Sequence, residues 1–480
     1  MNVEASADGD FWRWSAVEVA AAIRKREVSA QEVLESTIGR VEQVNPSVNA
    51  LIETSFDEAR DMARASDARI ARGEEIGILE GVPTSVKVNT DQAGHATTDG
   101  VVALAQNIAD EDSPGVALLR RAGATFVGRS NCPAFSFRWF SNNDLHGSTL
   151  NPWSAAHTPG GSSGGAASAV ASGLVQIALG GDIGGSVRYP AFACGVVGLR
   201  PTPGVIPQAV AGAGREGGSG PTVQMMAVQG PLARSVDDVA LALDALTGFD
   251  PRDPVSLSVR LARPGEVLPR VGIATSGAPG GLSASQAGAI ARAARALEEA
   301  GYVVEEVDVP QLEEAYRLWY LLVLEDFRVL WPVVQSLGDD GLRAAARHYF
   351  EVASEWWGTS PDLPAYIQGW TRRGVLIAEL QAFLERYPIL LLPSSTEPPF
   401  EQDADTHSVD RMRQLVQAQY AQMAVPVLGL PAAAVPTGVV DGLPAGVQLL
   451  GGKFQERVLL EAAKAIESAV GRFTPIDPIR

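Results

Sequence analysis

Along most of this chain of 480 residues, stretches in which apolar residues recur at helical spacing alternate with short apolar runs that are typical of strands. Near the N-terminus, apolar residues recur at helical spacing after two capping-box sequences. These boxes are Ser15 with Glu18 and Ser29 with Glu32. The helical patterns that follow are expected to end near Asn45 and Pro46, and a third helix is expected over 55–72. The first 72 residues therefore predict a group of helices.

Short apolar runs bounded by glycine and proline predict strands in the rest of the chain. The expected strands cover 84–88, 124–128, 174–179, 271–274, 302–309, 389–392, 432–435 and 447–450. The helices expected among and after them cover 113–123, 235–246, 285–300 and 456–470. Such alternation is typical of a mixed or parallel sheet with helices on both faces. The expected fold class is α/β, with a single large mixed β-sheet as its core.

The segment 311–386 interrupts this alternation with a long, mostly helical stretch rich in Trp, Tyr and Phe. The chain has no repeat of fixed period and no linker long enough to separate independent domains, so we expect one domain over 1–480. Its expected parts are N-terminal helices (1–72), a core (80–310), the helical segment (311–386) and a C-terminal return to the sheet (387–480). Irregular loops are expected at 201–220 and 393–410.

Composition narrows the choice of partners and cofactors. The formal net charge is −18, from 38 Lys and Arg against 56 Asp and Glu, which disfavours a nucleic-acid partner. Two cysteines, Cys132 and Cys194, and five histidines give little material for a disulfide framework or a Cys/His metal cluster. The N-terminus has no basic or apolar leader, and no apolar run approaches the length of a membrane span. We expect a cytoplasmic protein that needs neither metal nor cofactor and has no membrane partner.

Two glycine-framed serine loops, GGSSGG at 160–165 and GDIGGSVR at 181–188, carry the strongest chemical signal. Glycines let the backbone approach a ligand closely and aim successive N–H groups at it. Ser186, at the end of the second loop, is placed to attack a carbonyl beside N–H groups that would hold an oxyanion. The alternative is an anion-binding turn in which Ser186 caps a helix. No Walker lysine follows the loop, which excludes the P-loop form of such a turn.

A serine nucleophile needs a base, and Lys87 in the apolar sequence PTSVKVN is the candidate. Burial would lower the pKa of this lysine and leave it neutral enough to accept a proton. If Ser162 lies between the two groups, it can pass the proton of Ser186 to Lys87 without any histidine. The alternative is an ordinary charged side chain on a surface strand.

These elements, in this order and spacing, resemble the amidase signature family of hydrolases. The flanking segments GRSNCPAF, PAFACGVVGLRPTPG and GLPAGVQLLG also resemble that family, so the likeness extends over most of the chain. The resemblance implies that Ser186 is the nucleophile, Lys87 the base and Ser162 the bridging serine, whose preceding peptide bond is cis. It further implies an oxyanion hole and a supporting scaffold. The oxyanion hole would be made by the N–H groups of Ile183, Gly184, Gly185 and Ser186. The scaffold would be Ser163, Asp182 and Arg188.

The chain departs from the family pattern at two positions. The family usually has Asp directly after its lysine, where this chain has Val88, and Thr before its aspartate, where this chain has Gly181. Both changes remove hydrogen-bonding groups beside the site and bear on the orientation of Lys87 and Asp182. They leave the three reacting residues in place and are expected to widen or dry the pocket.

A different serine motif overlaps the first loop. Residues 160–164 also satisfy G-x-S-x-G, the nucleophile elbow of α/β-hydrolases, with His348 or His407 as a base. That elbow follows a strand directly, whereas here the preceding sequence is polar and rich in proline. The resemblance to the amidase signature family therefore takes precedence. The remaining histidines, His95, His146 and His157, are expected to be ordinary polar or loop residues.

The function implied is hydrolysis of a carboxylic amide, or of a related carbamate or ester, in a small molecule through an acyl-enzyme. Aromatic residues of the helical segment could line an apolar substrate mouth or simply form helix core. They are Trp319, Tyr320, Phe327, Trp331, Trp356, Trp357 and Trp370. Two other functions stay open, namely the glutaminase subunit of a tRNA-dependent amidotransferase and a non-catalytic anion-binding or assembly subunit. By analogy with the family, a homodimer is also expected.

Overall fold

A single mixed sheet organises the molecule. The computed structural model describes residues 9–209, 218–263, 265 and 269–479. Within them, eleven strands follow the order β1-β3-β2-β4-β6-β5-β10-β11-β9-β7-β8. The strands are β1 (Leu51–Thr54), β2 (Pro83–Lys87), β3 (Thr125–Ser130), β4 (Ile177–Asp182), β5 (Val197–Arg200), β6 (Val228–Ala233), β7 (Arg270–Ile273), β8 (Val303–Glu306), β9 (Ile389–Pro393), β10 (Ala432–Val440) and β11 (Leu443–Gly451). The expected α/β class with one large mixed sheet is confirmed.

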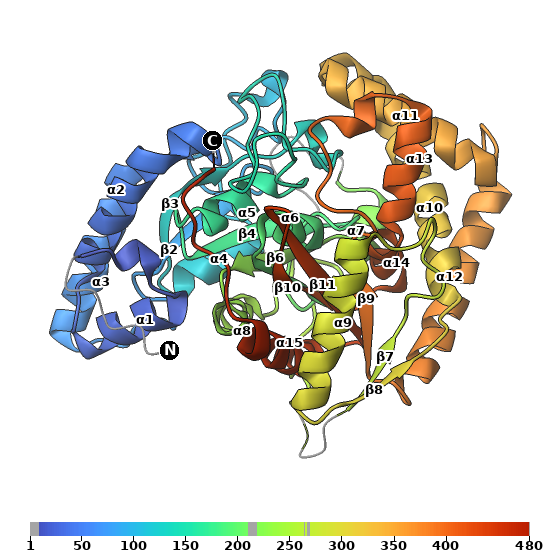
Figure 1. Ribbon diagram of the computed structural model, residues 1–480. Helices are drawn as coiled ribbons and strands as arrows, with labels where there is room; N and C mark the ends of the chain where they lie inside the picture. The colour runs from blue at the N-terminus through green and yellow to red at the C-terminus, as the bar shows by residue number, and fades with distance from the viewer. Residues whose placement is uncertain (1–8, 210–217, 264, 266–268, 480) are drawn as a thin grey trace.

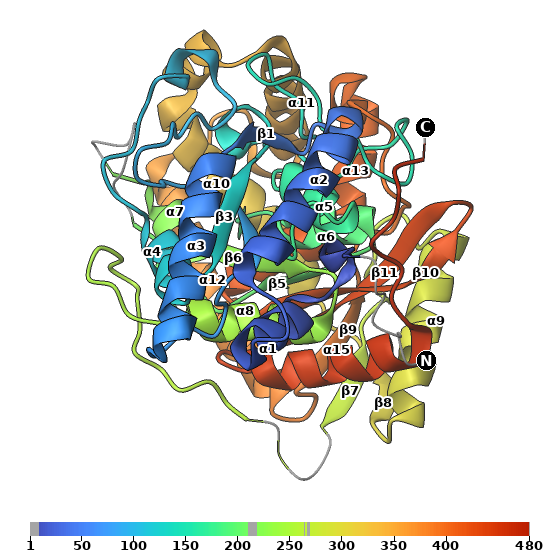
Figure 2. The same ribbon diagram turned by 90° about the vertical axis from the view of Figure 1, so that its left-hand side faces the viewer.

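Helices cover both faces of this sheet. They are α1 (Ala16–Lys25), α2 (Ala30–Val48), α3 (Phe56–Arg72), α4 (Pro114–Arg121), α5 (Gly164–Ala171), α6 (Arg188–Cys194), α7 (Pro221–Met226), α8 (Val236–Leu246), α9 (Ala284–Glu299), α10 (Gln311–Leu337), α11 (Asp340–Trp357), α12 (Leu363–Leu384), α13 (Val409–Ala418), α14 (Tyr420–Leu428) and α15 (Glu456–Val470). Figure 1 shows α5 and α6 on one side of the sheet and α8 and α15 on the other. In Figure 2, α2 and α3 lie in front of the edge that carries β3 and β1.

The N-terminal helices form where the sequence predicts them. Both capping boxes are present, with each serine side chain accepting from the backbone N–H three residues later. The second helix does not end at Pro46 but continues to Val48, where Asn49 adopts a left-handed conformation (φ 49°). Its side chain donates to two carbonyls of the loop after residue 145, so tertiary contacts fix this end.

Several short elements differ from the sequence-based expectation. The strand expected at 174–179 begins only at Ile177, because the chain is still turning after α5. Strands β1, β5 and β6 were not predicted. Strand β6 contains Gly230 and Pro231, which normally argue against a strand, yet it lies in the middle of the sheet between β4 and β5. Its pairing partners, rather than its own propensity, make it a strand.

The sheet brings the two serine loops and the lysine to one edge. Strands β2 and β4 run parallel, with Val86 opposite Leu179, so their carboxyl ends lie together. The first loop leads into α5 and the second into α6. Helix α5 packs so closely that a Cβ on Gly165 would lie 2.4 Å from the backbone nitrogen of Asn131. The small residues after the first loop therefore let this helix sit directly against the strands.

The segment 311–386 is helical as expected and consists of α10, α11 and α12. These helices pack with α13 and α14 into a second hydrophobic core, separate from the one around the sheet. Figure 1 shows this group in gold and orange on the side of the molecule opposite the N-terminal helices. The helical segment thus forms a layer that reaches the back of the second serine loop.

Residues 393–410 are largely irregular, as expected, with one short 3₁₀ turn at Ala404–Thr406. Of the loop expected at 201–220, residues 210–217 lie outside the described residues, as do residues 1–8 at the N-terminus. Across the described chain, none of the helices has the length and apolar character required to traverse a bilayer. The same residues contain no group of three or more His, Cys, Asp or Glu arranged to hold a metal ion.

Candidate active site

Lys87 ends strand β2 inside the protein. It is only 1% exposed, so the expectation of a buried lysine is confirmed and the surface alternative is wrong. Its Nζ donates to Ser162 Oγ at 2.6 Å. Burial lowers the pKa of Lys87 from its ordinary value of 10.5, while the nearby carboxylates of Asp99 and Asp182 act in the opposite direction. Burial therefore favours the neutral form of the lysine, which is hydrogen-bonded to Ser162.

The first serine loop is tied to the second. The Gly161–Ser162 peptide bond is cis, as the resemblance implies. Next to it, Ser163 accepts from the Gly181 N–H at 3.2 Å, and its hydroxyl faces the Gly181 carbonyl at 3.3 Å. The Ser163 N–H donates to the carbonyl of Ser186 at 3.1 Å. Ser163 thus holds the two loops together, in line with its expected supporting role.

Asp182 shapes the second loop from within. Its carboxylate accepts the N–H of Gly185 at 3.0 Å and that of Val187 at 3.1 Å. The same carboxylate forms a fully buried ion pair with Arg188, whose Nη2 lies 2.9 Å from Oδ1. Burial by itself would raise the pKa of Asp182, but Arg188 and Arg200 hold it at about 2. Asp182 and Arg188 are therefore structural supports of the loop that carries Ser186.

Two tryptophans hold the loop from outside. Trp139 Nε1 donates to the Gly184 carbonyl at 2.9 Å, and Trp319 Nε1 donates to the Ile183 carbonyl at 2.7 Å. In a planar peptide the C=O points opposite to the N–H of the next residue, so Trp319 turns the Gly184 N–H away from its indole and Trp139 does the same for the Gly185 N–H. Among the described residues, no hydrogen bond takes up the N–H groups of Ile183, Gly184 or Ser186. These three groups are available for an oxyanion.

The N–H of Gly185, which the resemblance places in the same group, has a partner inside the loop. It donates to the Asp182 carboxylate at 3.0 Å, because the loop folds around that side chain. Of the four N–H groups expected from the resemblance, the other three are open among the described residues.

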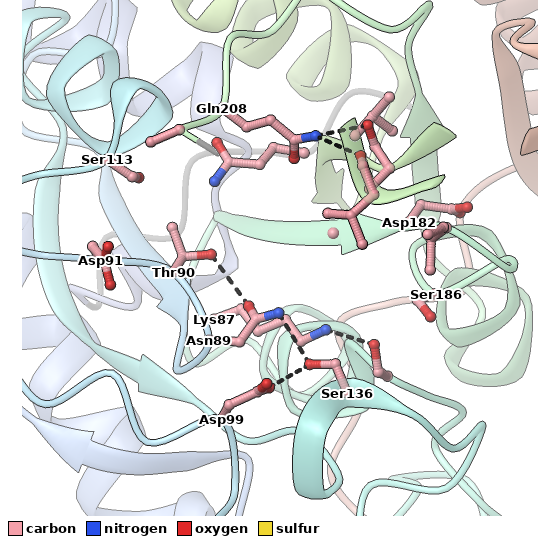
Figure 3. Close-up of a pocket in the computed structure, with 18 of the residues that line it drawn as sticks. Lys87, Asn89, Thr90, Asp91, Asp99, Ser113, Ser136, Asp182, Ser186 and Gln208 are labelled. Carbon is pink, nitrogen blue, oxygen red and sulfur yellow. Dashed lines mark hydrogen bonds between the residues drawn. The ribbon is translucent and has the colours of Figure 1, made fainter. Parts of the chain in front are cut away.

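A cavity of about 220 Å³ opens over these residues. It is lined by Lys87, Asn89, Thr90, Asp91, Asp99, Ser113, Phe135, Ser136, Ser162, Gly181, Asp182, Ile183, Ser186, Gln208, Ala209, Val223, Ala227, Val228 and Gln229. Figure 3 shows Asp182 and Ser186 at one end of this space and Asp91 and Ser113 at the other. Between them, Asn89 donates to Ser136 at 3.0 Å, and Ser136 donates to Asp99 at 2.6 Å (Figure 3). The cavity thus combines reacting groups with a mixed polar and apolar wall.

The aromatic residues of 311–386 do not line this cavity. All of its described lining residues come from the first half of the chain. Trp319 and Tyr320 are buried, and the other aromatics of the set pack among the helices, as the helix-core alternative expects. The expectation of an aromatic mouth built by these side chains is therefore not supported. Trp319 instead acts on the site through its hydrogen bond to Ile183.

The competing assignments of the serines find no support in the structure. The N-cap of α6 is Val187, without any side-chain capping bond, so Ser186 does not cap that helix. Ser162 is bonded to Lys87, whereas His348 is bonded to the carbonyl of Asp405. The described hydrogen bonds therefore pair Ser162 with a lysine rather than with a histidine, as the family resemblance implies.

The cysteines and the other histidines have ordinary environments. Both cysteines are free and buried, and burial raises the pKa of Cys132 to about 12. His95, His146 and His157 each bond to nearby polar side chains. His95 lies between Glu53 and Glu58 and so anchors the loop that carries Asp91 to the N-terminal elements.

The two departures from the family pattern have different consequences. Val88 is fully buried, and its N–H donates to the carbonyl of Ser130, so it serves as core. Gly181 lines the cavity and is only partly buried. Asp182 is oriented by Arg188 and by the loop's own N–H groups, without any help from position 181.

Several supporting residues were missed from the sequence. Arg188 donates to Gln448 Oε1 and to the carbonyl of Gln422, and Trp139 holds Gly184. These residues lie far from the loop in sequence and in no motif that refers to it.

Comparison with known proteins places these findings in context. The family model described as Amidase matches residues 32–460. An indoleacetamide hydrolase of Bradyrhizobium diazoefficiens is 39% identical over 96% of this chain and 88% of that protein. One subunit of the glutamyl-tRNA(Gln) amidotransferase of Carboxydothermus hydrogenoformans is 31% identical over 95% of this chain and 97% of that protein. A bacterial aryl acylamidase of solved structure superposes with a TM-score of 0.79 at 29% identity, over 95% of this chain and 96% of that one.

Proposed function

This chain belongs to the amidase family and is a hydrolase of non-peptide amide bonds, and we propose that Ser186, Ser162 and Lys87 perform the reaction on primary amides of aryl-substituted acetic acids. The observation that carries the assignment of roles is the contact of 2.6 Å between a buried lysine and a serine that shares its cavity with Ser186. A buried neutral lysine is a competent base, whereas an exposed one would be protonated.

The proposed reaction begins with attack of Ser186 Oγ on the amide carbon. Ser162 accepts the proton of Ser186 and passes its own proton to neutral Lys87. The resulting tetrahedral intermediate collapses as the C–N bond breaks, and the proton returns through Ser162 to the departing nitrogen. Ammonia leaves, because a protonated amine is a far better leaving group than an amide anion. Water then attacks the acyl-enzyme by the same proton path and releases the carboxylic acid with Ser186 restored.

The negative charge of the tetrahedral intermediate falls on the former carbonyl oxygen. We assign its stabilisation to the N–H groups of Ile183, Gly184 and Ser186, which no other described group occupies. Donors of this kind act best at about 2.7–3.1 Å from the oxyanion and when they are fixed before the reaction. In this proposal Trp319 fixes the peptide that carries the Gly184 N–H, while Trp139 and Asp182 hold the neighbouring Gly184–Gly185 peptide of the loop.

The substrate class rests on the relative named indoleacetamide hydrolase and on the shape of the cavity. Phe135, Val223 and Val228 supply apolar wall for a ring, while Gln208 and Asn89 supply hydrogen-bonding groups. A primary amide needs little space on the side of its nitrogen. The cavity volume is therefore assigned to the acyl group.

A hydrolysis panel tests this function. Indole-3-acetamide, phenylacetamide, acetamide, acetanilide, an aryl carbamate and glutamine would be incubated with the protein, and release of ammonia or amine would be measured. We expect kcat/KM for the two arylacetamides to exceed that for acetamide by at least about tenfold, since ring burial adds binding energy. Preference for glutamine would favour the glutaminase alternative instead. Absence of hydrolysis of every amide would contradict the proposal.

The pH dependence provides a separate prediction. Lys87 must be neutral in the free enzyme, and burial lowers its pKa below the ordinary 10.5. Activity should therefore be low at acid pH, rise as pH increases through the lowered pKa, and reach a plateau before 10.5. The measurement is kcat/KM against pH for a neutral amide, whose own ionisation does not change. A profile that falls with rising pH over this range would rule out a neutral lysine base.

A further inference from the structure

Four glycines lie in the second serine loop and directly before it, at 180, 181, 184 and 185, and three of them have a steric or conformational reason to be glycine. A Cβ on Gly180 would lie 2.8 Å from Ser163 Oγ, and one on Gly184 would lie 3.0 Å from the sulfur of Met423. Gly185 has a φ of +91°, which side-chain-bearing residues rarely adopt, and its Cβ would meet Gln422. Packing or backbone conformation therefore requires glycine at these positions.

Gly181 is the exception. A Cβ at this position would have one neighbour within 4 Å, the Val228 carbonyl oxygen at the ordinary contact distance of 3.6 Å. Its backbone belongs to strand β4, and its φ lies outside the left-handed region. Neither close contacts nor the backbone conformation therefore requires glycine at position 181. In β4, Gly181 is also the one residue that is not fully buried, because it faces the cavity.

The position of Gly181 in the cavity is fixed by its neighbours. It directly precedes Asp182, which Figure 3 shows beside Ser186. Ser163 holds both the N–H and the carbonyl of Gly181, so the backbone does not shift to accommodate a larger residue. Across the sheet it pairs with Gln229, which lines the same cavity. Because strand residues alternate between faces, a side chain at 181 would share the face of Gln229 and project into the cavity on the side away from Ser163.

We propose that Gly181 is a specificity-determining residue, whose missing side chain leaves room, in the cavity that it lines together with Ser186, for the ring of a bulky acyl group. This inference rests on the proposed function, in which the leaving ammonia needs little space and the acyl group fills the cavity. The open position then decides which acids can be released as products. With a larger residue at 181, the enzyme becomes selective for short, unbranched acyl groups.

The test is a graded series of Gly181→Ala and Gly181→Thr, assayed with phenylacetamide and acetamide. Threonine suits the strand because β-branched side chains favour extended backbone. The readout is the ratio of kcat/KM for phenylacetamide to that for acetamide. We expect this ratio to fall on the order of 10- to 200-fold in Gly181→Thr, with Gly181→Ala in between. Gly374→Ala is the matched control, because Gly374 lies on α12 with open space around it.

A second measurement keeps the inference testable even if the amide class is wrong. The rate of covalent labelling would be compared for two fluorophosphonates, one with a methyl substituent and one with a benzyl substituent. We expect Gly181→Thr to slow the benzyl probe far more than the methyl probe. The thermal unfolding midpoint of each variant confirms that the fold is kept.

The outcomes separate the two proposals. An unchanged ratio for both amides and probes in Gly181→Thr overturns the inference and leaves the proposed function in place. Equal losses of kcat/KM and of labelling rate for large and small compounds overturn it too. Position 181 would then act on the nucleophile rather than on the width of the cavity. Labelling selectivity that changes as expected, in a protein that hydrolyses no amide, supports the role of Gly181 and contradicts the proposed substrate class. A protein that reacts with neither probe overturns both.

Discussion

Ser186→Ala is expected to lower kcat/KM for an arylacetamide by about 10⁶-fold while the protein stays folded. Without the hydroxyl there is no acyl-enzyme, and the three N–H groups can only polarise a carbonyl that water must attack unaided. The side chain of Ser186 makes no hydrogen bond among the described residues that the fold would lose. Purified variant protein would be assayed for ammonia release and for fluorophosphonate labelling, both of which should vanish.

A matched control for this variant is Ser354→Ala on α11, whose exposed hydroxyl bonds only to a carbonyl of its own helix. Its activity should equal that of the unaltered chain. Lys87→Met should also abolish turnover, and the double variant should be no worse than the poorer single variant, because the residues act as one unit. Substantial hydrolysis by pure Ser186→Ala would exclude Ser186 as the nucleophile.

Arg188→Met is expected to produce the largest loss of stability. The substitution leaves the Asp182 carboxylate fully buried without its main counter-ion. Removal of one partner from a buried pair costs about 3–5 kcal/mol. The second cation, Arg200 at 3.5 Å, remains and places the expected loss near the lower end of this range. Arg188 also donates to Gln448 and to the Gln422 carbonyl, which would both lose a partner.

The measurement is the free energy of unfolding from urea titration, alongside the thermal midpoint. Arg413→Met provides the contrast, because Arg413 pairs with Glu355 and Asp410 at the surface, where such pairs contribute about 0–1 kcal/mol. Activity of Arg188→Met should fall together with stability, since Asp182 orients the loop before Ser186. A variant as stable as Arg413→Met would show that the buried pair is dispensable.

Much of the fold was predictable because its signals are local. The capping boxes at Ser15 and Ser29 each involve only four consecutive residues, and a helix begins directly after each of these serines. Strand β6 was not predictable, because Gly230 and Pro231 oppose a strand and only pairing with β4 and β5 imposes one. The cavity wall was not predictable either. Which side chains face a cavity depends on packing between distant elements, so the sequence left open whether the aromatics of 311–386 line a mouth or form helix core, and the structure places them in the core.

The sequence alone was enough to propose which residues carry the chemistry. Lys87, Ser162 and Ser186 lie in short motifs whose glycines and neighbours are contiguous, and local order is enough to identify them. The tertiary structure decided how those residues are held. It brings Trp319 to Ile183 across 136 residues and Arg188 to Gln448 across 260, and it withdraws the Gly185 N–H toward Asp182. It also distinguishes Gly181 from the glycines around it. The physical reason is that burial, charge compensation and free space are properties of residues brought together by folding, and no segment of the chain contains them alone.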